Sequence, residues 1–157
     1  MSNDKSSNLW TIVLLLGLTL LLVVGYKIKN GLTPAITFTA PLDKSCDLRQ
    51  GECQSKLPDG GKVSFSITPK TIPILRPLAL GVNIKGVKVS RVEVDFIGIG
   101  MDMGYNRSKL KKADTNYFTG RAVIPVCVRS KMDWEARVLL YTKNGLIMIP
   151  FRFYTIK

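Results

Sequence analysis

The sequence predicts an all-β domain of the immunoglobulin-like β-sandwich class, preceded by a single apolar helix. Two observations predict the sandwich. Six short segments alternate apolar and polar residues with a period of two, and turn-forming Gly, Pro, Asp and Asn residues separate them. A third observation predicts the helix, since a long uncharged run lies close to the amino terminus of the 157-residue chain.

The apolar run is "LWTIVLLLGLTLLLVVGY", residues 9–26. As a helix, its eighteen residues would span roughly 27 Å, close to the ~30 Å hydrocarbon core of a bilayer. A cleaved signal peptide is the alternative, but no small-x-small cleavage site and no lipoprotein cysteine follow closely. We therefore expect an uncleaved signal anchor, preceded by a short cytoplasmic tail at 1–8.

Charge does not orient this anchor, because Lys5 precedes it and Lys27 and Lys29 follow it. Cys46 and Cys53, in the loop-like stretch "SCDLRQGECQ", suit a disulfide in an oxidising compartment. The predicted topology is a single-pass protein of the bacterial inner membrane with its carboxyl-terminal domain in the periplasm.

The third cysteine leaves at least one thiol unpaired within the chain. Cys127 lies in the apolar stretch "AVIPVCVRS", which predicts a shielded thiol. A disulfide between Cys127 and either Cys46 or Cys53 is the competing arrangement, because three cysteines do not determine a connectivity.

A linker at 27–44 is expected to lead into the β-sandwich ectodomain at 45–157. Period-two patterns predict its strands, and an Asn-Gly hairpin turn is expected at Lys143-Asn144-Gly145. In the segment 91–98, Glu93 and Asp95 alternate with apolar residues and are expected to face solvent. The predicted strands are 62–68, 78–84, 91–98, 117–128, 134–142 and 146–156.

The chain is basic, with 23 Lys and Arg against 11 Asp and Glu, but only Arg107–Lys112 forms a cluster of basic residues. This scatter favours a solvated face near anionic lipid headgroups over a nucleic-acid partner. The chain has no histidine, which excludes Ser–His and Cys–His catalytic pairs and His-ligated zinc. We therefore expect a protein that is not an enzyme and does not bind nucleic acid.

The stretch "FIGIGMDMGYN" contains Gly98, Gly100 and Gly104, close to the pattern of a dinucleotide-binding turn. It lacks the βαβ context of that motif, so we expect a loop between strands. Met101 and Met103 are two residues apart and point the same way in extended geometry. Together with Met132 and Cys127 they could bind Cu(I), because thioethers and thiolates are its ligands. Met also commonly fills gaps in cores, which is the competing interpretation.

These segments, with "YFTGRAVIPVC" and "MDW", resemble the pattern of membrane-anchored FixH-like and YtkA/CopC-like periplasmic proteins over roughly residues 60–155. The resemblance implies an immunoglobulin-like domain associated with copper handling or with assembly of cation pumps and haem–copper oxidases. CopC-type copper sites use histidines, which this chain lacks, and "SCDLRQGEC" has no counterpart in that pattern. The matching positions are Met101, Met103, Gly120, Pro125, Met132 and Trp134.

Two functions are therefore expected of this chain. The first is a non-catalytic, membrane-anchored periplasmic accessory protein that handles Cu(I) or assists assembly of a respiratory or metal-transport complex. The second is a structural interaction module or small subunit that docks on a membrane protein complex without a metal. No other cofactor is expected.

Overall fold

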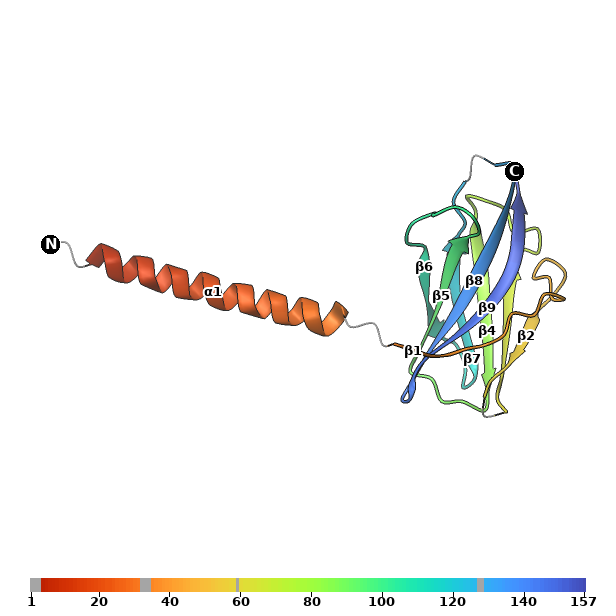
Figure 1. The fold of residues 1–157 in the computed structure, drawn as a ribbon, viewed down its shortest axis with the longest axis horizontal. Helices are drawn as coiled ribbons and strands as arrows, with labels where there is room; N and C mark the ends of the chain where they lie inside the picture. The colour runs from red at the N-terminus through yellow and green to blue at the C-terminus, as the bar shows by residue number, and fades with distance from the viewer. Residues whose placement is uncertain (1–3, 32–34, 59, 127–128) are drawn as a thin grey trace. The chain divides into compact units, whose positions relative to one another are not determined.

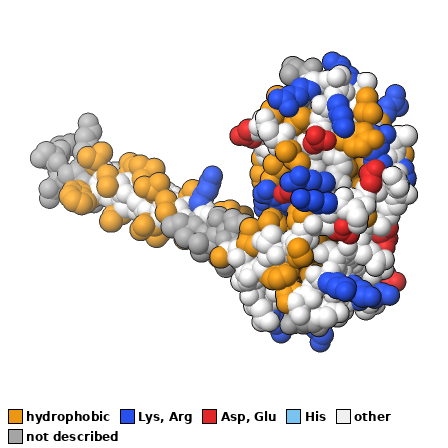
Figure 2. Space-filling view, turned by 45° about the vertical axis from the view of Figure 1, so that its right-hand side comes forward, with side chains coloured by type: hydrophobic (Ala, Val, Ile, Leu, Met, Phe, Trp, Pro, Cys, Tyr) orange, Lys and Arg blue, Asp and Glu red, His pale blue; other side chains and the backbone are white. Residues whose placement is uncertain are grey.

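The computed structural model describes residues 4–31, 35–58, 60–126 and 129–157, and places one helix before a β domain (Figure 1). Helix α1 (Asp4–Gly31) includes Asn8–Lys27, a section long and apolar enough to cross a membrane. None of that section is buried, and apolar side chains cover it (Figure 2). The predicted apolar helix is confirmed, whereas its retention as an anchor stays a prediction, because a signal sequence has the same length and composition.

The described strands of the domain form one sheet in the order β1-β9-β8-β5-β6-β7-β4-β3-β2. Only the pairing of β1 with β9 is parallel, and all other neighbours are antiparallel. The strands are β1 (Ile36–Thr39), β2 (Cys53–Lys56), β3 (Lys62–Thr68), β4 (Pro77–Lys85), β5 (Arg91–Gly98), β6 (Arg107–Lys112), β7 (Tyr117–Val123), β8 (Lys131–Thr142) and β9 (Gly145–Ile156).

The sheet curls into a half-barrel because β6 belongs to both of its halves. Arg107–Leu110 pair with β5, whereas Lys111 and Lys112 pair with β7. The two halves meet across the core, where the ring centroids of Phe65 on β3 and Phe151 on β9 are 5.4 Å apart. The all-β prediction is confirmed, and the immunoglobulin-like arrangement in two sheets stays a prediction.

The inward faces of the long strands agree with the period-two patterns. Alternate residues of a strand point to opposite faces, so one apolar set enters the core while the other set meets solvent. On β9, Ile147 is partly buried, and Ile149 and the phenylalanines are buried. The other buried sets are Val63, Phe65 and Ile67 on β3, Leu78, Leu80, Val82 and Ile84 on β4, Val92, Val94 and Phe96 on β5, and Trp134, Ala136, Val138 and Leu140 on β8.

Three strands lack a predictive pattern in the sequence. β1 lies inside the stretch interpreted as the 27–44 linker, β2 begins at Cys53, the second cysteine of the disulfide loop, and β6 is the basic cluster. Each takes its conformation from the neighbouring strand that it pairs with, since short or polar strands carry little local signal. β7 ends at Val123, before Pro125, because proline cannot donate a ladder hydrogen bond. Cys127 and Val128, also in the predicted strand 117–128, lie outside the described residues.

The expectation that Glu93 faces solvent is wrong. Its side chain points outward from β5, but its residue is only 3% exposed, because neighbouring side chains cover it. The Tyr141 hydroxyl donates to Glu93 Oε2 at 2.8 Å, and Arg91 and Arg107 lie 3.4 and 3.7 Å from its carboxylate. Arg107 Nη2 also lies 2.9 Å from Asp95 Oδ2, and Asp95 is half-buried.

The predicted hairpin between the last two strands is confirmed, with Lys143 and Asn144 between the paired residues Thr142 and Gly145. Gly145 has a φ of 122°, and a Cβ there would overlap the side chain of Thr37 on β1. Glycine is therefore required both by the backbone conformation and by the close approach of β1.

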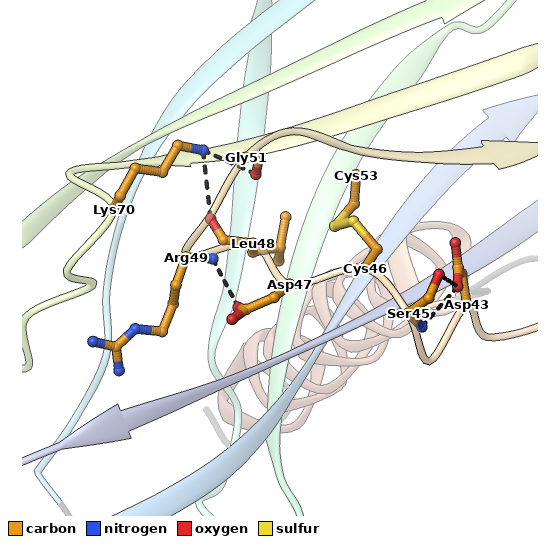
Figure 3. The surroundings of a disulfide bond; sticks show 9 residues. All are labelled: Asp43, Ser45, Cys46, Asp47, Leu48, Arg49, Gly51, Cys53 and Lys70. Atoms are coloured by element: carbon orange, nitrogen blue, oxygen red, sulfur yellow. Dashed lines mark hydrogen bonds between the residues drawn. A yellow bond between two sulfur atoms is a disulfide. The ribbon is translucent and has the colours of Figure 1, made fainter.

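The disulfide predicted between Cys46 and Cys53 is present, with their Cα atoms 5.8 Å apart (Figure 3). Inside the loop that it closes, Leu48 is fully buried in the core. Lys70 Nζ donates to the carbonyl of Gly51 at 3.0 Å and lies 3.4 Å from that of Leu48. The loop is thus held to the sheet by packing and hydrogen bonds as well as by the covalent bond.

Candidate functional site

The methionine loop, residues 99–106, connects β5 to β6 at one end of the domain (Figure 1). The Ile99 amide donates to the Asp133 carbonyl at 2.9 Å, which fixes the loop to the start of β8. Within the loop, Asp102 Oδ1 accepts a hydrogen bond from the Gly104 amide at 2.8 Å. Gly100 and Gly104 both adopt positive φ values, 77° and 70°. The prediction of a loop instead of a dinucleotide-binding turn is confirmed, since strand β6 follows and not a helix.

Two of the predicted methionines converge on Gly98, the last residue of β5. A Cβ placed on Gly98 would lie 2.6 Å from Met132 Cε and 2.8 Å from Met103 Cγ. The same point is 2.9 Å from the Met101 carbonyl oxygen. Met132 is buried, and Met101 and Met103 are partly buried against the core. Gly98 also pairs with Trp134, so the three predicted methionines and Trp134 lie at this end of the domain.

This arrangement offers soft sulfur ligands instead of a conventional metal site. Among the described residues, no three His, Cys, Asp or Glu side chains come close enough to hold an ion. Met103 and Met132 are brought together, and Cys127, the predicted thiolate ligand, lies outside the described residues. The contacts at Gly98 are also those of ordinary core packing, in which methionine fills irregular gaps. The Cu(I) site stays a prediction.

Exposed apolar side chains from three segments, one of which is the methionine loop, lie at this end of the domain. The Leu75 amide donates to the Ile124 carbonyl at 2.9 Å, and Asn106 Nδ2 donates to the Val123 carbonyl at 3.2 Å. These bonds join the β3–β4 connection, the methionine loop and the end of β7. We call the exposed set the apolar rim: Tyr105 (81% exposed), Leu75 (63%), Val123 (45%) and Val126 (45%).

The backbone conformation presents one member of the apolar rim to solvent. Ile72 and Leu75 have φ values of 45° and 57°, in the left-handed region that side chains other than glycine rarely adopt. Ile72 is buried and anchors the segment, whereas Leu75 projects outward. Such strain concentrates at functional sites because the surrounding structure must stabilise it. It therefore points to the rim as a candidate contact surface.

Two exposed arginines flank the apolar rim in sequence: Arg76 directly precedes β4, and Arg121 lies on β7, which pairs with β4. Neither forms an ion pair with a described residue, whereas Arg107, next to Tyr105, is engaged by Asp95. The rim thus has an unneutralised positive border. Charged borders around apolar centres are typical of protein–protein interfaces.

The cleft that adjoins the methionine loop has a volume of about 260 Å³ and is lined in part by Ile99, Asp133 and Asp47. This volume is below the roughly 300–1,000 Å³ that is usual for small-molecule sites. The end of the domain therefore suits contact with a macromolecular surface better than enclosure of a ligand.

Sequence patterns did not reveal the apolar rim, because its residues come from three distant segments that only the fold joins. Tyr105 was the one available signal, as a large aromatic residue between Gly104 and Asn106 in a turn-rich stretch. Comparison with models of protein families, with characterised proteins and with solved structures finds no match to this chain. The resemblance to FixH-like and YtkA/CopC-like proteins therefore stays a prediction.

Proposed function

We propose that this chain is a non-catalytic accessory protein, anchored to a membrane by α1, whose β domain binds a protein partner outside the cytoplasm. The apolar section of α1 supports the anchor, and the Cys46–Cys53 disulfide supports an oxidising compartment. A bacterial inner membrane with the domain in the periplasm fits both features. The meeting of the two sheet halves at Phe65 and Phe151 supports an immunoglobulin-like fold.

The apolar rim carries this proposal. Tyr105 is 81% exposed, and a left-handed backbone holds Leu75 outward. Both side chains would bury apolar surface on binding, which stabilises a complex. Aromatic residues dominate binding energy at interfaces, so Tyr105 is the expected anchor. The partner surface should have an apolar centre and an acidic border opposite Arg76 and Arg121. A subunit of a membrane protein complex meets this description.

Site-specific photo-crosslinking tests this function. A photoreactive phenylalanine analogue at Tyr105 should link the full chain, in the membranes of its own cell, to one defined protein. The added change Leu75→Ser should abolish that product. The same analogue at Tyr117, a 40% exposed tyrosine outside the apolar rim, is the matched control and should give no such product. The same products from both positions, or insensitivity to Leu75→Ser, would refute the proposed interface.

A second candidate function, the handling of Cu(I), is favoured by one observation. Met103 from the methionine loop and Met132 from β8 approach the same point at Gly98, and thioethers prefer Cu(I) over harder ions. The ligand set would be Met101, Met103 and Met132, with Cys127 as a further ligand. An accessory protein that binds Cu(I) at this end could deliver it to a partner held at the adjacent apolar rim.

Cu(I) titration of the purified full chain against a competing chelator tests this candidate. The copper function predicts an affinity tighter than micromolar that is lost in the double variant Met101→Leu/Met103→Leu, which conserves side-chain volume. Met148→Leu removes a methionine from the outer face of β9 and should leave the affinity unchanged. Affinity weaker than micromolar, or equal loss in both variants, would eliminate the copper function without affecting the proposed protein contact.

A further inference from the structure

Three lysines stand in a row across the outer face of β2, β3 and β4. Lys56 is paired with Lys62, and Lys62 is paired with Lys85 on its other side. All three side chains are exposed. Like charges that lie directly opposite one another destabilise a sheet, so this row does not serve the stability of the domain.

The row belongs to a larger group of exposed lysines at the end of the domain opposite the methionine loop. Lys88 lies in the β4–β5 connection, Lys112 ends β6, and Lys143 lies in the β8–β9 turn. Two clefts connect these turns: one of about 490 Å³ lined by Lys88 and Lys143, and one of about 390 Å³ lined by Lys88 and Lys112. We call Lys56, Lys62, Lys85, Lys88, Lys112 and Lys143 the basic end (lower end of the domain in Figure 2).

The charge of the basic end is not neutralised within the domain. Among the described residues, every ion pair is formed by an arginine, so none of the six lysines has a carboxylate partner. Asp114, in the β6–β7 turn, is the described carboxylate at this end, and its Oδ1 accepts the amide of Thr115. The basic end therefore presents strong positive potential to whatever lies next to it.

The chain from α1 enters the domain at the basic end. β1 begins at Ile36, which pairs with Leu146 beside the β8–β9 turn, and Thr37 and Phe38 of β1 line the same cleft as Lys88 and Lys143. Only nine residue steps separate Ile36 from Lys27, the last residue of the apolar section. A chain of that length reaches at most about 30 Å.

We infer that the basic end is a contact surface for anionic phospholipid headgroups of the membrane that holds α1. The inference rests on the anchor in the proposed function. The short tether confines the basic end to the neighbourhood of that membrane, and anionic lipids attract clusters of exposed lysines. Lysine suits this contact because its compact ammonium group acts as a point charge on a flexible stem. The contact would direct the opposite end, with the methionine loop and the apolar rim, toward a partner.

Lysine labelling of the full chain in lipid nanodiscs tests this inference. The rate of amine acylation at each lysine is measured by mass spectrometry in neutral nanodiscs and in nanodiscs with about 30% anionic phosphatidylglycerol. In the anionic nanodiscs, the acylation rate of the lysines of the basic end should fall to about one fifth of its value in neutral nanodiscs, or lower. Salt at about 0.5 M should remove this difference. Lys131 and Lys157, at the other end, are internal controls whose rates should not change.

Matched variants show whether the basic end itself is responsible. The triple variant Lys62→Gln/Lys85→Gln/Lys88→Gln should remove most of the protection of Lys56 and Lys143. The triple variant Lys109→Gln/Lys131→Gln/Lys157→Gln loses the same charge elsewhere and should keep that protection. Equal rates in both lipids for the unmodified chain would overturn the inference. Protection by a DNA duplex in neutral nanodiscs, with none from anionic lipid, would overturn it in favour of nucleic acid. Neither result concerns the apolar rim, so the crosslinking at Tyr105 tests the proposed partner separately.

Discussion

Glu93 is a charged residue in a position from which the sheet excludes almost all solvent. A buried carboxylate is tolerated when partners surround it, and here Arg91, Arg107 and the Tyr141 hydroxyl do so. The guanidinium of Arg91 also lies 3.7 Å from the centroid of the Tyr141 ring. These residues come from β5, β6 and β8, so their network joins three neighbouring strands on the outer face of the sheet.

Replacement of Tyr141 by Phe should give a pH-dependent loss of stability. Burial raises the pKa of Tyr141, and the hydrogen bond to Glu93 raises it further. Its folded pKa thus exceeds the unfolded value of about 10, so the stability contributed by the neutral phenol is fully present below that pH. That contribution is lost as the pH rises through the folded pKa. Tyr141→Phe should lower the free energy of unfolding by about 2 kcal/mol at neutral pH, since a hydrogen bond to a charged group is lost.

Denaturant unfolding from pH 7 to about 11 measures this effect. The difference between the unmodified protein and Tyr141→Phe should shrink above pH 10, because only the unmodified protein loses this contribution there. Tyr105→Phe, at a site 81% exposed, is the control and should change the free energy of unfolding little at neutral pH. A difference that stays constant across the range would contradict the assigned role of the hydrogen bond.

The segment between Cys46 and Cys53 is an element without regular secondary structure that nevertheless contributes to the core. Leu48 is fully buried, and Lys70 donates to the backbone of the segment (Figure 3). The disulfide closes a short loop before the edge strand β2, whose only described neighbour is β3. It thereby restrains a sheet edge that has few other contacts.

Loss of this disulfide should weaken the domain without unfolding it. Closing an eight-residue loop contributes about 2.5 kcal/mol by the chain-entropy estimate. Cys46→Ala/Cys53→Ala should therefore lower the free energy of unfolding by about that amount, while the burial of Leu48 keeps the segment in place. Reduction of the unmodified protein should give a similar loss, and reduction of the double variant should give none. Because Cys127 is then the last cysteine of the chain, no disulfide within the chain remains to be reduced. An unchanged free energy of unfolding in the double variant would contradict the stabilising role of the 46–53 disulfide.

The whole molecule consists of an apolar helix and a basic β domain whose two ends differ in surface chemistry. The methionine loop and the apolar rim lie at one end, and the basic end receives the chain from α1. Such a division suits a tethered protein, because one end can face the membrane while the other meets a partner. This division requires that α1 stays attached as a membrane anchor and that the β domain lies outside the cytoplasm.

Protease treatment of intact spheroplasts should digest the β domain, while a cytoplasmic marker protein survives. The mature chain, analysed by mass spectrometry, should still contain residues 9–26, because no suitable cleavage site follows them. A protected domain would reverse the predicted orientation. An amino terminus after Tyr26 would show that α1 is a cleaved signal peptide and would remove the anchor.

The sequence by itself determined the apolar helix, the all-β class, the inward faces of the long strands and the 46–53 disulfide. These features depend on local periodicity, composition and short cysteine spacing, which neighbouring residues carry. The tertiary structure alone decided that Glu93 is buried, that β1, β2 and β6 are strands, and that Met103 and Met132 meet at Gly98. It also assembled the apolar rim and the row of Lys56, Lys62 and Lys85. The physical reason is that burial, strand register and side-chain clusters depend on which strands become neighbours, and these pairings join residues far apart in the chain.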